Sequence, residues 1–241
     1  MPSSPLKSPL EPYALTHPTL PKGLYYIPDF ITEDEEAQLA RKVTEAPRSK
    51  WVTLSRRRLQ TYGGTPHAKG TILEPLPSWT QVPFDRFRAL GIFTKVSYHP
   101  NHLLVNEYLA GQGIMPHEDG PYYLPTVATI TLGSYTVLDL YPPNPTFPEK
   151  GPAASILLER CSLVILSGEA YTAWRHGIAE RSSDDRVIGT AKDDLDRWVD
   201  PSTLPSSPTR DFSQILSRGT RISLTYRQVA KPIRIPRALL R

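Results

Sequence analysis

The amino-acid sequence predicts a mainly β protein with supporting helices, arranged as a sandwich or barrel. From about residue 103 onward, seven short segments are rich in Val, Ile, Thr, Leu and Tyr and are separated by turn residues, a pattern typical of short β-strands. Only two segments, both before residue 92, space their apolar residues as a helix does. The length of 241 residues suits one sizeable domain with tails. Helices followed by many short strands indicate this fold class.

The first helix is predicted over residues 32–46, TEDEEAQLARKVTEA. It has a Thr in the N-cap position, acidic residues in the first turn and apolar residues at helical spacing. A second, weaker helical pattern covers residues 84–91, FDRFRALG. Strands are predicted in the segments HLLVNEYL, TVATITLG, YTVLDLY, SILLE, SLVILSG, YTAWRHGI and TRISLTYRQV.

Clusters of proline mark the breaks in this pattern, and the chain has 26 prolines in all. Residues 1–22 are Pro/Ser-rich and are expected to form a disordered lead. Residues 141–155 and 200–211 are expected to be loops between structured segments.

Composition narrows the class of protein. The single cysteine, Cys161, excludes an internal disulfide framework and a cysteine-based zinc site, and it predicts an intracellular protein of the nucleus or cytoplasm. We expect Cys161 to be a buried, inert thiol. The N-terminus lacks the apolar region of a signal peptide, and no stretch reaches the ~20 apolar residues of a membrane span. A net charge of +4 permits a nucleic-acid partner without requiring one.

The segment MPHEDGPYY places His117 two residues before Asp119. It is either a surface loop, a catalytic dyad or half of a metal site. In an extended chain, side chains at i and i+2 leave the same face, so His117 and Asp119 can reach one point. His176, at the end of a predicted strand, would complete the two-histidine, one-carboxylate set that binds non-haem Fe(II). A chance occurrence of these residues remains an alternative.

The segment RISLTYR has one polar and one apolar face. Arg221, Ser223, Thr225 and Arg227 alternate with apolar residues. The segment is either a surface strand or a strand whose polar face lines an interior. Buried arginines need anionic partners, and a guanidinium suits a carboxylate, so the second reading predicts a dicarboxylate that chelates the metal at its other end.

The order of N-x-Y, H-x-D, H-G-I and R-x-x-x-T-x-R resembles the AlkB family of Fe(II)/2-oxoglutarate-dependent dioxygenases. The resemblance covers nearly all of residues 24–230 and is greatest to the AlkB homologue 6 branch. It implies a double-stranded β-helix (jelly roll) with an N-terminal α/β nucleotide-recognition lid. The implied parts are a lead at 1–22, helical support and the lid at 23–95, the jelly-roll core at 96–232 and a basic tail at 233–241.

The resemblance also implies the roles of single residues. The implied iron ligands are His117, Asp119 and His176, and the implied 2-oxoglutarate contacts are Asn106, Tyr108, Arg221, Ser223 and Arg227. The implied reaction uses Fe(II), 2-oxoglutarate and O2 to oxidise a C–H bond, such as an N-methyl group of nucleic acid, with release of succinate and CO2. Two positions depart from repair-type members. Ser223 stands where they carry Asn, and Pro121 stands where they carry an acidic residue near the substrate base.

The segment LSRRRLQTYGG suggests how a substrate is held. Arg56, Arg58, Gln60 and Tyr62 share one face of an extended chain, and Arg57 lies on the other. This segment, expected outside the barrel, is either a grip for single-stranded nucleic acid or a solvated basic loop. Tyr122 and Tyr123 form either a wall of the site or ordinary packing.

Two classes of function remain open at this point. The first is an active dioxygenase, monomeric and not membrane-bound, that acts on a methylated nucleic acid or protein. The second is a nucleic-acid- or protein-binding module on the same fold with little or no turnover. The complete sets of metal-ligand and arginine residues favour the first.

Overall fold

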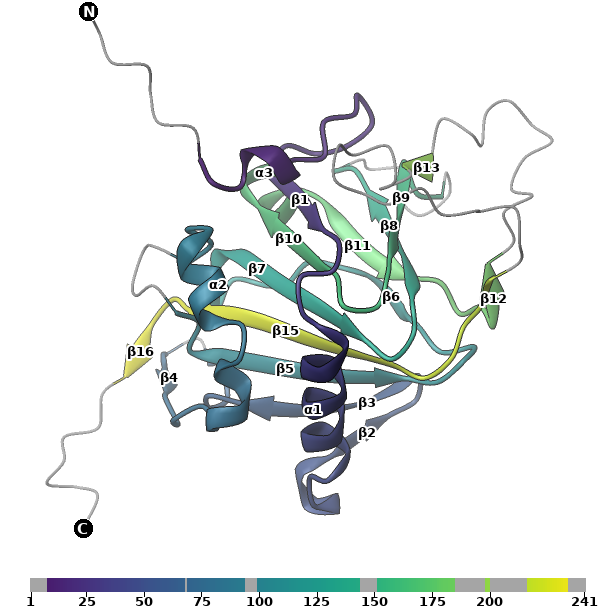
Figure 1. Cartoon of the computed structure of the whole chain (residues 1–241). Helices are drawn as coiled ribbons and strands as arrows, with labels where there is room; N and C mark the ends of the chain where they lie inside the picture. Colours follow the sequence, from purple (N-terminus) through teal and green to yellow (C-terminus); the bar gives the residue numbers. More distant parts are fainter. Residues whose placement is uncertain are drawn as a thin grey trace, which may run out of the picture.

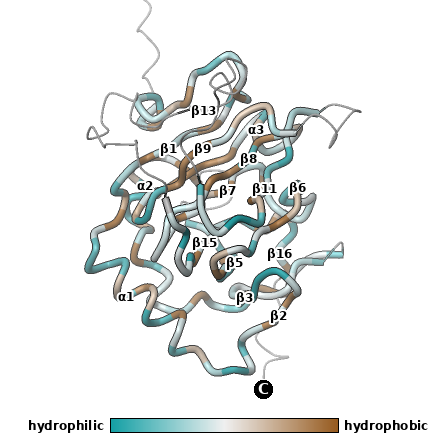
Figure 2. Tube along the Cα trace, turned by 90° about the vertical axis from the view of Figure 1, so that its right-hand side faces the viewer, coloured by the Kyte–Doolittle hydropathy of each residue, from teal (hydrophilic) through white to brown (hydrophobic). Residues whose placement is uncertain are grey.

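The computed structural model describes residues 8–67, 69–93, 99–143, 151–184, 198–199 and 216–233. Two mainly antiparallel β-sheets face each other, and two α-helices cover the outer face of the larger sheet (Figures 1 and 2). The predicted fold class, mainly β with supporting helices, is confirmed. Among the described residues, no helix is long and apolar enough to cross a membrane.

The larger sheet has seven strands in the order β1-β10-β7-β15-β5-β3-β2, and every neighbouring pair is antiparallel. Its strands are β1 (Leu24–Ile27), β10 (Leu163–Ser167), β7 (Tyr123–Leu132), β15 (Arg221–Val229), β5 (His102–Tyr108), β3 (Arg57–Tyr62) and β2 (Val52–Leu54). The central strand β15 is buried along its whole length.

The smaller sheet has five strands in the order β13-β9-β8-β11-β6. Its strands are β13 (Trp198–Val199), β9 (Ala154–Leu158), β8 (Thr136–Tyr141), β11 (Arg175–Ile178) and β6 (Ile114–His117). Two further pairs are made by β12 (Ser183–Asp184) with β14 (Leu216–Ser217) and by β4 (Thr71–Ile72) with β16 (Pro232–Ile233).

The helices are short. They are α1 (Glu33–Thr44), α2 (Phe84–Ala89) and α3 (Gly168–Thr172), with 3-10 turns η1 (Glu11–Tyr13), η2 (Arg48–Lys50) and η3 (Ser78–Gln81). Both predicted helices are therefore present. In α1, the hydroxyl of Thr32 accepts a bond from the Glu35 backbone N–H at 3.2 Å, and the Glu35 carboxylate accepts one from the Thr32 N–H at 2.9 Å. This reciprocal pair is a capping box.

Replacing Thr32 with alanine is expected to lower the free energy of unfolding by about 1 kcal/mol, because a helix N–H loses its partner. Urea unfolding followed by circular dichroism measures the change. Thr44→Ala is the matched control, since it removes a hydroxyl at the last residue of the same helix and alanine has the higher helix propensity. Equal losses in the two variants would contradict a stabilising cap.

Two cores lie on opposite faces of the larger sheet. One joins its outer face to the helices and includes Leu39, Phe87, Leu224 and Tyr226. The other lies between the two sheets. In Figure 2, α1 and α2 lie to one side of β15 and β5, while β6, β8 and β11 lie to the other. The strands of the larger sheet thus present one face to the helices and one to the smaller sheet.

The N-terminal segment differs from the expected disordered lead. In residues 8–22, Leu10 and Leu15 are buried, and Ala14 forms a β-bridge to Tyr25. Leu10 joins the helix-side core and Leu15 joins the core between the sheets. Two apolar side chains thus anchor a segment whose Pro/Ser-rich composition indicates disorder. Residues 1–7 lie outside the described residues.

Two other segments also differ. The expected strand YTAWRHGI begins in helix α3, and only its second half forms β11. The segment LSRRRLQTYGG is not outside the barrel, because β3 pairs with β5 and extends the larger sheet. The residues 144–150 of one predicted loop, all of the loop at 200–211 and most of the predicted tail (234–241) lie outside the described residues.

Candidate active site

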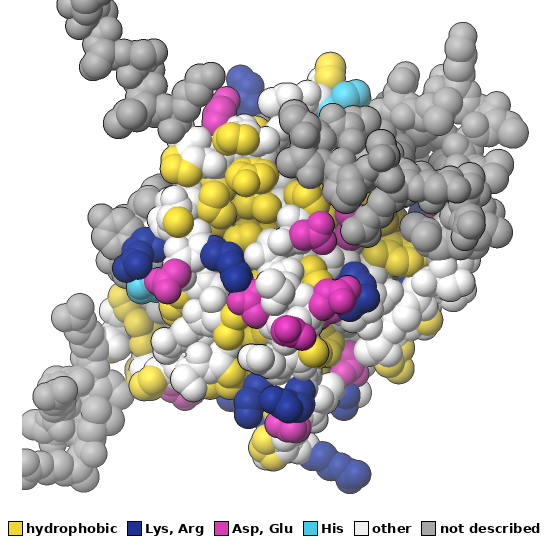
Figure 3. Space-filling view, in the orientation of Figure 1, with side chains coloured by type: hydrophobic (Ala, Val, Ile, Leu, Met, Phe, Trp, Pro, Cys, Tyr) yellow, Lys and Arg dark blue, Asp and Glu magenta, His cyan; other side chains and the backbone are white. Residues whose placement is uncertain are grey.

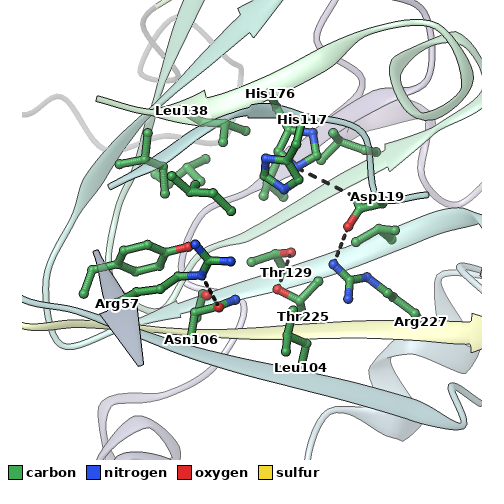
Figure 4. A pocket seen from close by; sticks show the side chains of 18 of the residues that line it. Arg57, Leu104, Asn106, His117, Asp119, Thr129, Leu138, His176, Thr225 and Arg227 are labelled. Atoms are coloured by element: carbon green, nitrogen blue, oxygen red, sulfur yellow. Dashed lines mark hydrogen bonds and ion pairs between the residues drawn. The ribbon is translucent and has the colours of Figure 1, made fainter. Parts of the chain in front are cut away.

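The two sheets enclose a cavity of about 250 Å³ whose wall contains most of the polar side chains singled out in the sequence (Figure 4). The polar lining residues are Arg57, Asn106, Tyr108, His117, Glu118, Asp119, Tyr123, Thr129, His176, Arg221, Ser223, Thr225 and Arg227. The apolar ones are Leu104, Ile114, Val127, Leu138, Leu158, Val164, Leu166 and Ile178. The cavity therefore joins a charged region to an apolar one, as ligand sites do.

Strand β15 divides its side chains between this cavity and the helix-side core. Arg221 and Arg227 line the cavity with Ser223 and Thr225 between them, and Leu224 and Tyr226 pack under the helices. The alternation predicted for this strand is correct, and its polar face points inward.

His117, Asp119 and His176 come together at one end of the cavity. His117 on β6 is the register partner of His176 on β11, and their ring centroids are 4.5 Å apart. The Asp119 Oδ2 atom lies 3.8 Å from His176 Nε2. Nδ1 of His117 lies 2.9 Å from the Met115 carbonyl oxygen. A carbonyl only accepts, so Nδ1 donates in this contact and Nε2 is the nitrogen left for another partner.

The protonation states of His176 and Asp119 suit metal binding. Burial lowers the pKa of His176 to about 4, so its ring is neutral at pH 7. Burial alone would raise the pKa of Asp119, but the charge and hydrogen bond of Arg227, with smaller contributions from the two histidines, outweigh burial and hold this pKa below its usual value. Neutral imidazoles and a carboxylate are the forms that bind metal.

The donor set fits a non-haem Fe(II) site in its chemistry. Among the described residues, no group of three His, Cys, Asp or Glu side chains has the geometry of a formed metal site. The carboxylate of Asp119 is instead bonded through Oδ1 to the guanidinium of Arg227. The three residues thus share one end of the cavity, with the carboxylate of Asp119 held by an arginine.

Arg221 lies at another part of the cavity wall and is 4% exposed. Its Nη2 donates to Thr131 Oγ1 at 3.0 Å, and its Cζ lies 5.7 Å from the centre of the Tyr108 ring. Its Nε has no hydrogen-bond partner, and no described carboxylate pairs with it. Burial lowers the pKa of Arg221 to about 10, which still leaves it charged at pH 7. An unpaired buried cation is costly unless an anionic ligand binds there.

Strand β5 faces β15 with two more polar side chains. Asn106 pairs in register with Ser223, and Tyr108 pairs with Arg221. Burial raises the pKa of Tyr108, so its hydroxyl keeps its proton and can donate to an anion. Because Tyr108 lies beside Arg221, both side chains can bind the same carboxylate of a ligand.

Several residues that line the cavity or support its wall were not assigned to the site from the sequence. Thr129 on β7 donates to Thr225 at 3.3 Å, and Thr131 holds Arg221. Arg57 on β3 enters the cavity, and its Nε donates to Asn106 Oδ1 at 3.1 Å. Strand alternation places Arg57 opposite its neighbours, but which face meets the cavity depends on the pairing of β3 with β5.

The other proposed substrate residues are scattered. Arg56 pairs with Glu180 at the surface. Arg58 is bonded to Glu107, Gln60 is fully buried and donates to the Val43 carbonyl at 2.9 Å, and the Tyr62 hydroxyl donates to Gln60. Tyr123 lines the cavity, whereas Tyr122 lies on the surface. A role for these residues in substrate binding stays a prediction, and burial argues against it for Gln60.

His102 on β5 makes stability depend on pH. It is 1% exposed, neither of its ring nitrogens has a hydrogen-bond partner in the described structure, and burial lowers its pKa from 6.5 to about 3. Between these pH values the unfolded chain binds a proton that the folded protein does not, so stability falls as the pH falls.

From about pH 7 to about pH 5, this one group is expected to lower the free energy of unfolding by about 2 kcal/mol. In His102→Leu, the free energy of unfolding is expected to fall less between these two pH values, by the amount that His102 contributes. Urea unfolding of both proteins at the two pH values measures it. Parallel declines in the two proteins would show that His102 is not the cause.

Comparisons with known proteins agree with this geometry. A family model described as the 2OG-Fe(II) oxygenase superfamily matches residues 44–227. The Danio rerio protein named "Probable RNA/DNA demethylase ALKBH6" is 44% identical over 221 residues, covering 89% of this chain and 88% of that protein. "Uncharacterized protein L905" of Acanthamoeba polyphaga mimivirus is 31% identical over 216 residues, covering 87% and 86%.

A solved structure, "The structure of OsALKBH1", shares the fold with a TM-score of 0.53 and 15% identity, over 87% of this chain and 99% of that one. The chain therefore belongs to the 2OG-Fe(II) oxygenase superfamily, among its AlkB-type members, and is an oxidoreductase that uses Fe(II), 2-oxoglutarate and O2.

Proposed function

We propose that His117, Asp119 and His176 hold the iron and that the enzyme removes an N-methyl group from a nucleic acid. In this assignment Arg221 and Tyr108 bind the distal carboxylate of 2-oxoglutarate. The other end of the co-substrate, next to the metal, is contacted by Asn106, Ser223 and Arg227, which line the same cavity.

The observation that carries this assignment is the state of Arg221. It is a buried cation without a carboxylate partner among the described residues, and it faces the same cavity as two histidines and an aspartate. A dicarboxylate can bind both the guanidinium and the metal, since one carboxylate pairs with the guanidinium and the other end reaches the metal. No other charge arrangement in the described cavity needs an anion so directly.

The bound Fe(II), 2-oxoglutarate and O2 supply the oxidation of a methyl carbon, with release of succinate and CO2, after which the hydroxymethyl group leaves as formaldehyde. The chain supplies binding and orientation. Arg227 fixes the carboxylate of Asp119, and the Met115 carbonyl fixes the ring of His117. The apolar wall that includes Leu138 and Leu166 keeps water out.

A nucleic-acid substrate is supported by the name of the Danio rerio relative and by the aromatic rim of the cavity. Tyr123 lines the cavity and Tyr122 beside it is 41% exposed, and exposed aromatic rings stack on unpaired bases. The helix-covered face is a poor candidate for contacts with phosphates. In Figure 3, its basic side chains mostly lie beside acidic ones, and Arg86 pairs there with Glu35.

The test is to incubate the iron-loaded enzyme with 2-oxoglutarate and O2 and to measure succinate and formaldehyde. Methylated single-stranded oligonucleotides, their unmethylated counterparts and methylated peptides are compared. Formaldehyde formed only from a methylated oligonucleotide supports the proposal. Formaldehyde formed only from a peptide would make the enzyme a protein demethylase, and binding without turnover would make it a binding module.

A further inference from the structure

Three consecutive arginines of the β2–β3 hairpin have three different environments. Arg56 pairs with Glu180 at 3.0 Å on the surface. Arg58 makes two bonds to Glu107, at 2.6 and 2.8 Å, and its Cζ lies 4.0 Å from the centre of the Trp51 ring. Arg57, between them, points into the cavity (Figure 4). It has no carboxylate partner among the described residues, so its charge is the unmatched one of the three.

One hydrogen bond holds the guanidinium of Arg57 in place. Its Nε donates to Asn106 Oδ1 at 3.1 Å, the guanidinium makes no other hydrogen bond to a described residue, and its charge acts on the neighbouring Tyr108. Strand β3 runs beside β5, which carries Asn106. The bond at Nε anchors the plane of the group while its terminal Nη atoms remain free to donate. A guanidinium is a rigid fork of donors that stays charged and never accepts.

The other charged side chains of the cavity wall are accounted for. Arg227 is bonded to Asp119. Glu118 lies 3.4 Å from Arg175. Arg221 is assigned above to the distal carboxylate of the co-substrate. Only Arg57 is left with a charge that neither the chain, in its described part, nor the co-substrate in this assignment neutralises.

The rim near Asp119 carries one acid, Glu118, and that carboxylate is already paired with Arg175. The residue two positions after Asp119 is Pro121, which lies exposed and has no charge. The following residues, Tyr122 and Tyr123, add no carboxylate. A base that enters the cavity therefore meets a cationic donor at Arg57 and, among the described residues of this rim, no carboxylate without a cationic partner. Charge repulsion is strong in a partly enclosed cavity because water screens it poorly.

We propose that Arg57 makes this site select neutral methylated bases with a carbonyl oxygen and reject methylated bases that carry a positive charge. The inference rests on the proposed nucleic-acid demethylation and names its substrate class. The Nη groups donate to the carbonyl oxygen of a neutral base. A cationic base has an amino group at the same place. The Nη donors of Arg57 would then face another hydrogen-bond donor, and the positive charge of the guanidinium would repel that of the base.

Two single-stranded oligonucleotides that differ at one base test the inference. One carries 3-methyluracil, which is neutral and has a carbonyl at C4. The other carries 3-methylcytosine, which is cationic at neutral pH and has an amino group at C4. Their dissociation constants are measured with enzyme loaded with Fe(II) and saturating 2-oxoglutarate, with O2 excluded. The 3-methyluracil strand is expected to bind at least about tenfold more tightly, the effect of one charge-assisted hydrogen bond.

Variants of Arg57 then test whether this residue is the cause. Arg57→Gln is expected to bring the ratio of the two dissociation constants close to one, and Arg57→Glu to invert it. Arg57→Lys keeps the charge and is expected to keep the preference for the neutral base. Arg41→Gln is the control, because Arg41 lies exposed on α1 and away from the cavity. Saturating 2-oxoglutarate cancels any effect of the lost bond to Asn106.

Three results would overturn the inference: tighter binding of the cationic base, an unchanged ratio in Arg57→Gln, or no preference between the strands. Demethylation of a cationic methyl-lysine peptide in preference to the 3-methyluracil strand would also overturn it. Failure of the proposed function gives a different result, namely no formaldehyde from any nucleic acid. The binding ratio is measured without turnover, so the two failures can be distinguished.

Discussion

Alanine at His117, Asp119 or His176 is expected to abolish succinate formation and to weaken metal binding at least about 100-fold. Changes to residues that merely support metal ligands already cost 10–100-fold in affinity, and each of these residues is assigned as a ligand. Binding of Mn(II) as a redox-stable probe, measured by calorimetry, reports affinity without turnover. Circular dichroism reports whether the fold persists.

Asp119 needs a second variant because its carboxylate also neutralises Arg227. Alanine there leaves a buried cation unpaired, which can destabilise a protein by about 3–5 kcal/mol. Asp119→Asn keeps an oxygen that accepts from Arg227, so it separates loss of metal binding from loss of folding. His17→Ala is the control histidine, since His17 is exposed and its ring hydrogen-bonds only Thr19 among the described residues. Full metal affinity in all three cavity variants would refute the ligand assignment.

The parts of the site that could be predicted from sequence depend on short-range geometry. Strand alternation has a period of two, so the polar face of β15 followed from its residues alone. The spacing of His117 and Asp119 follows the same rule. The capped helix α1 was also predictable, because Thr32 and Glu35 act within one turn.

The parts that could not be predicted depend on contacts between distant segments. The side of β3 that meets the cavity is set by its register with β5, some 45 residues later. That register brings Arg57 into the cavity and sends Gln60 to the core beside α1. Strand pairing is decided by the packing of whole faces, and a one-residue shift would exchange these two roles.

Helix α3 shows a similar limit within a shorter segment. Residues such as Tyr171 and Thr172 favour strands by composition. The chain nevertheless turns at Gly168, which has a φ of +50°, and the Tyr171 hydroxyl donates to the Gly120 carbonyl at 2.8 Å. This bond ties α3 to the loop that carries Asp119. Tertiary contacts therefore override the local propensity at a position beside the active site.

Arg221→Ala is expected to weaken 2-oxoglutarate binding about 100-fold, while the affinity for Mn(II) alone changes little. Two hydrogen bonds to a charged group contribute about 1.5–3 kcal/mol each, and about 2.7 kcal/mol corresponds to 100-fold. Arg221→Lys is expected to restore little of the affinity, because an ammonium is a point charge that lacks the fork of a guanidinium. Calorimetric titration of the Mn(II)-loaded proteins with 2-oxoglutarate measures both effects.

The thermal stability of Arg221→Ala distinguishes a role of Arg221 in binding from a role in supporting the fold. Without co-substrate, Arg221 is a buried charge whose guanidinium, among the described residues, hydrogen-bonds only Thr131 and lies near the Tyr108 ring. Its removal is therefore expected to leave the midpoint of thermal unfolding unchanged or raised. Adding Mn(II) and 2-oxoglutarate is expected to raise the midpoint of the unmodified protein and to have almost no effect beyond that of the metal on Arg221→Ala. A variant that is less stable without ligand, yet binds 2-oxoglutarate normally, would show that Arg221 supports the sheet and that another cation holds the co-substrate.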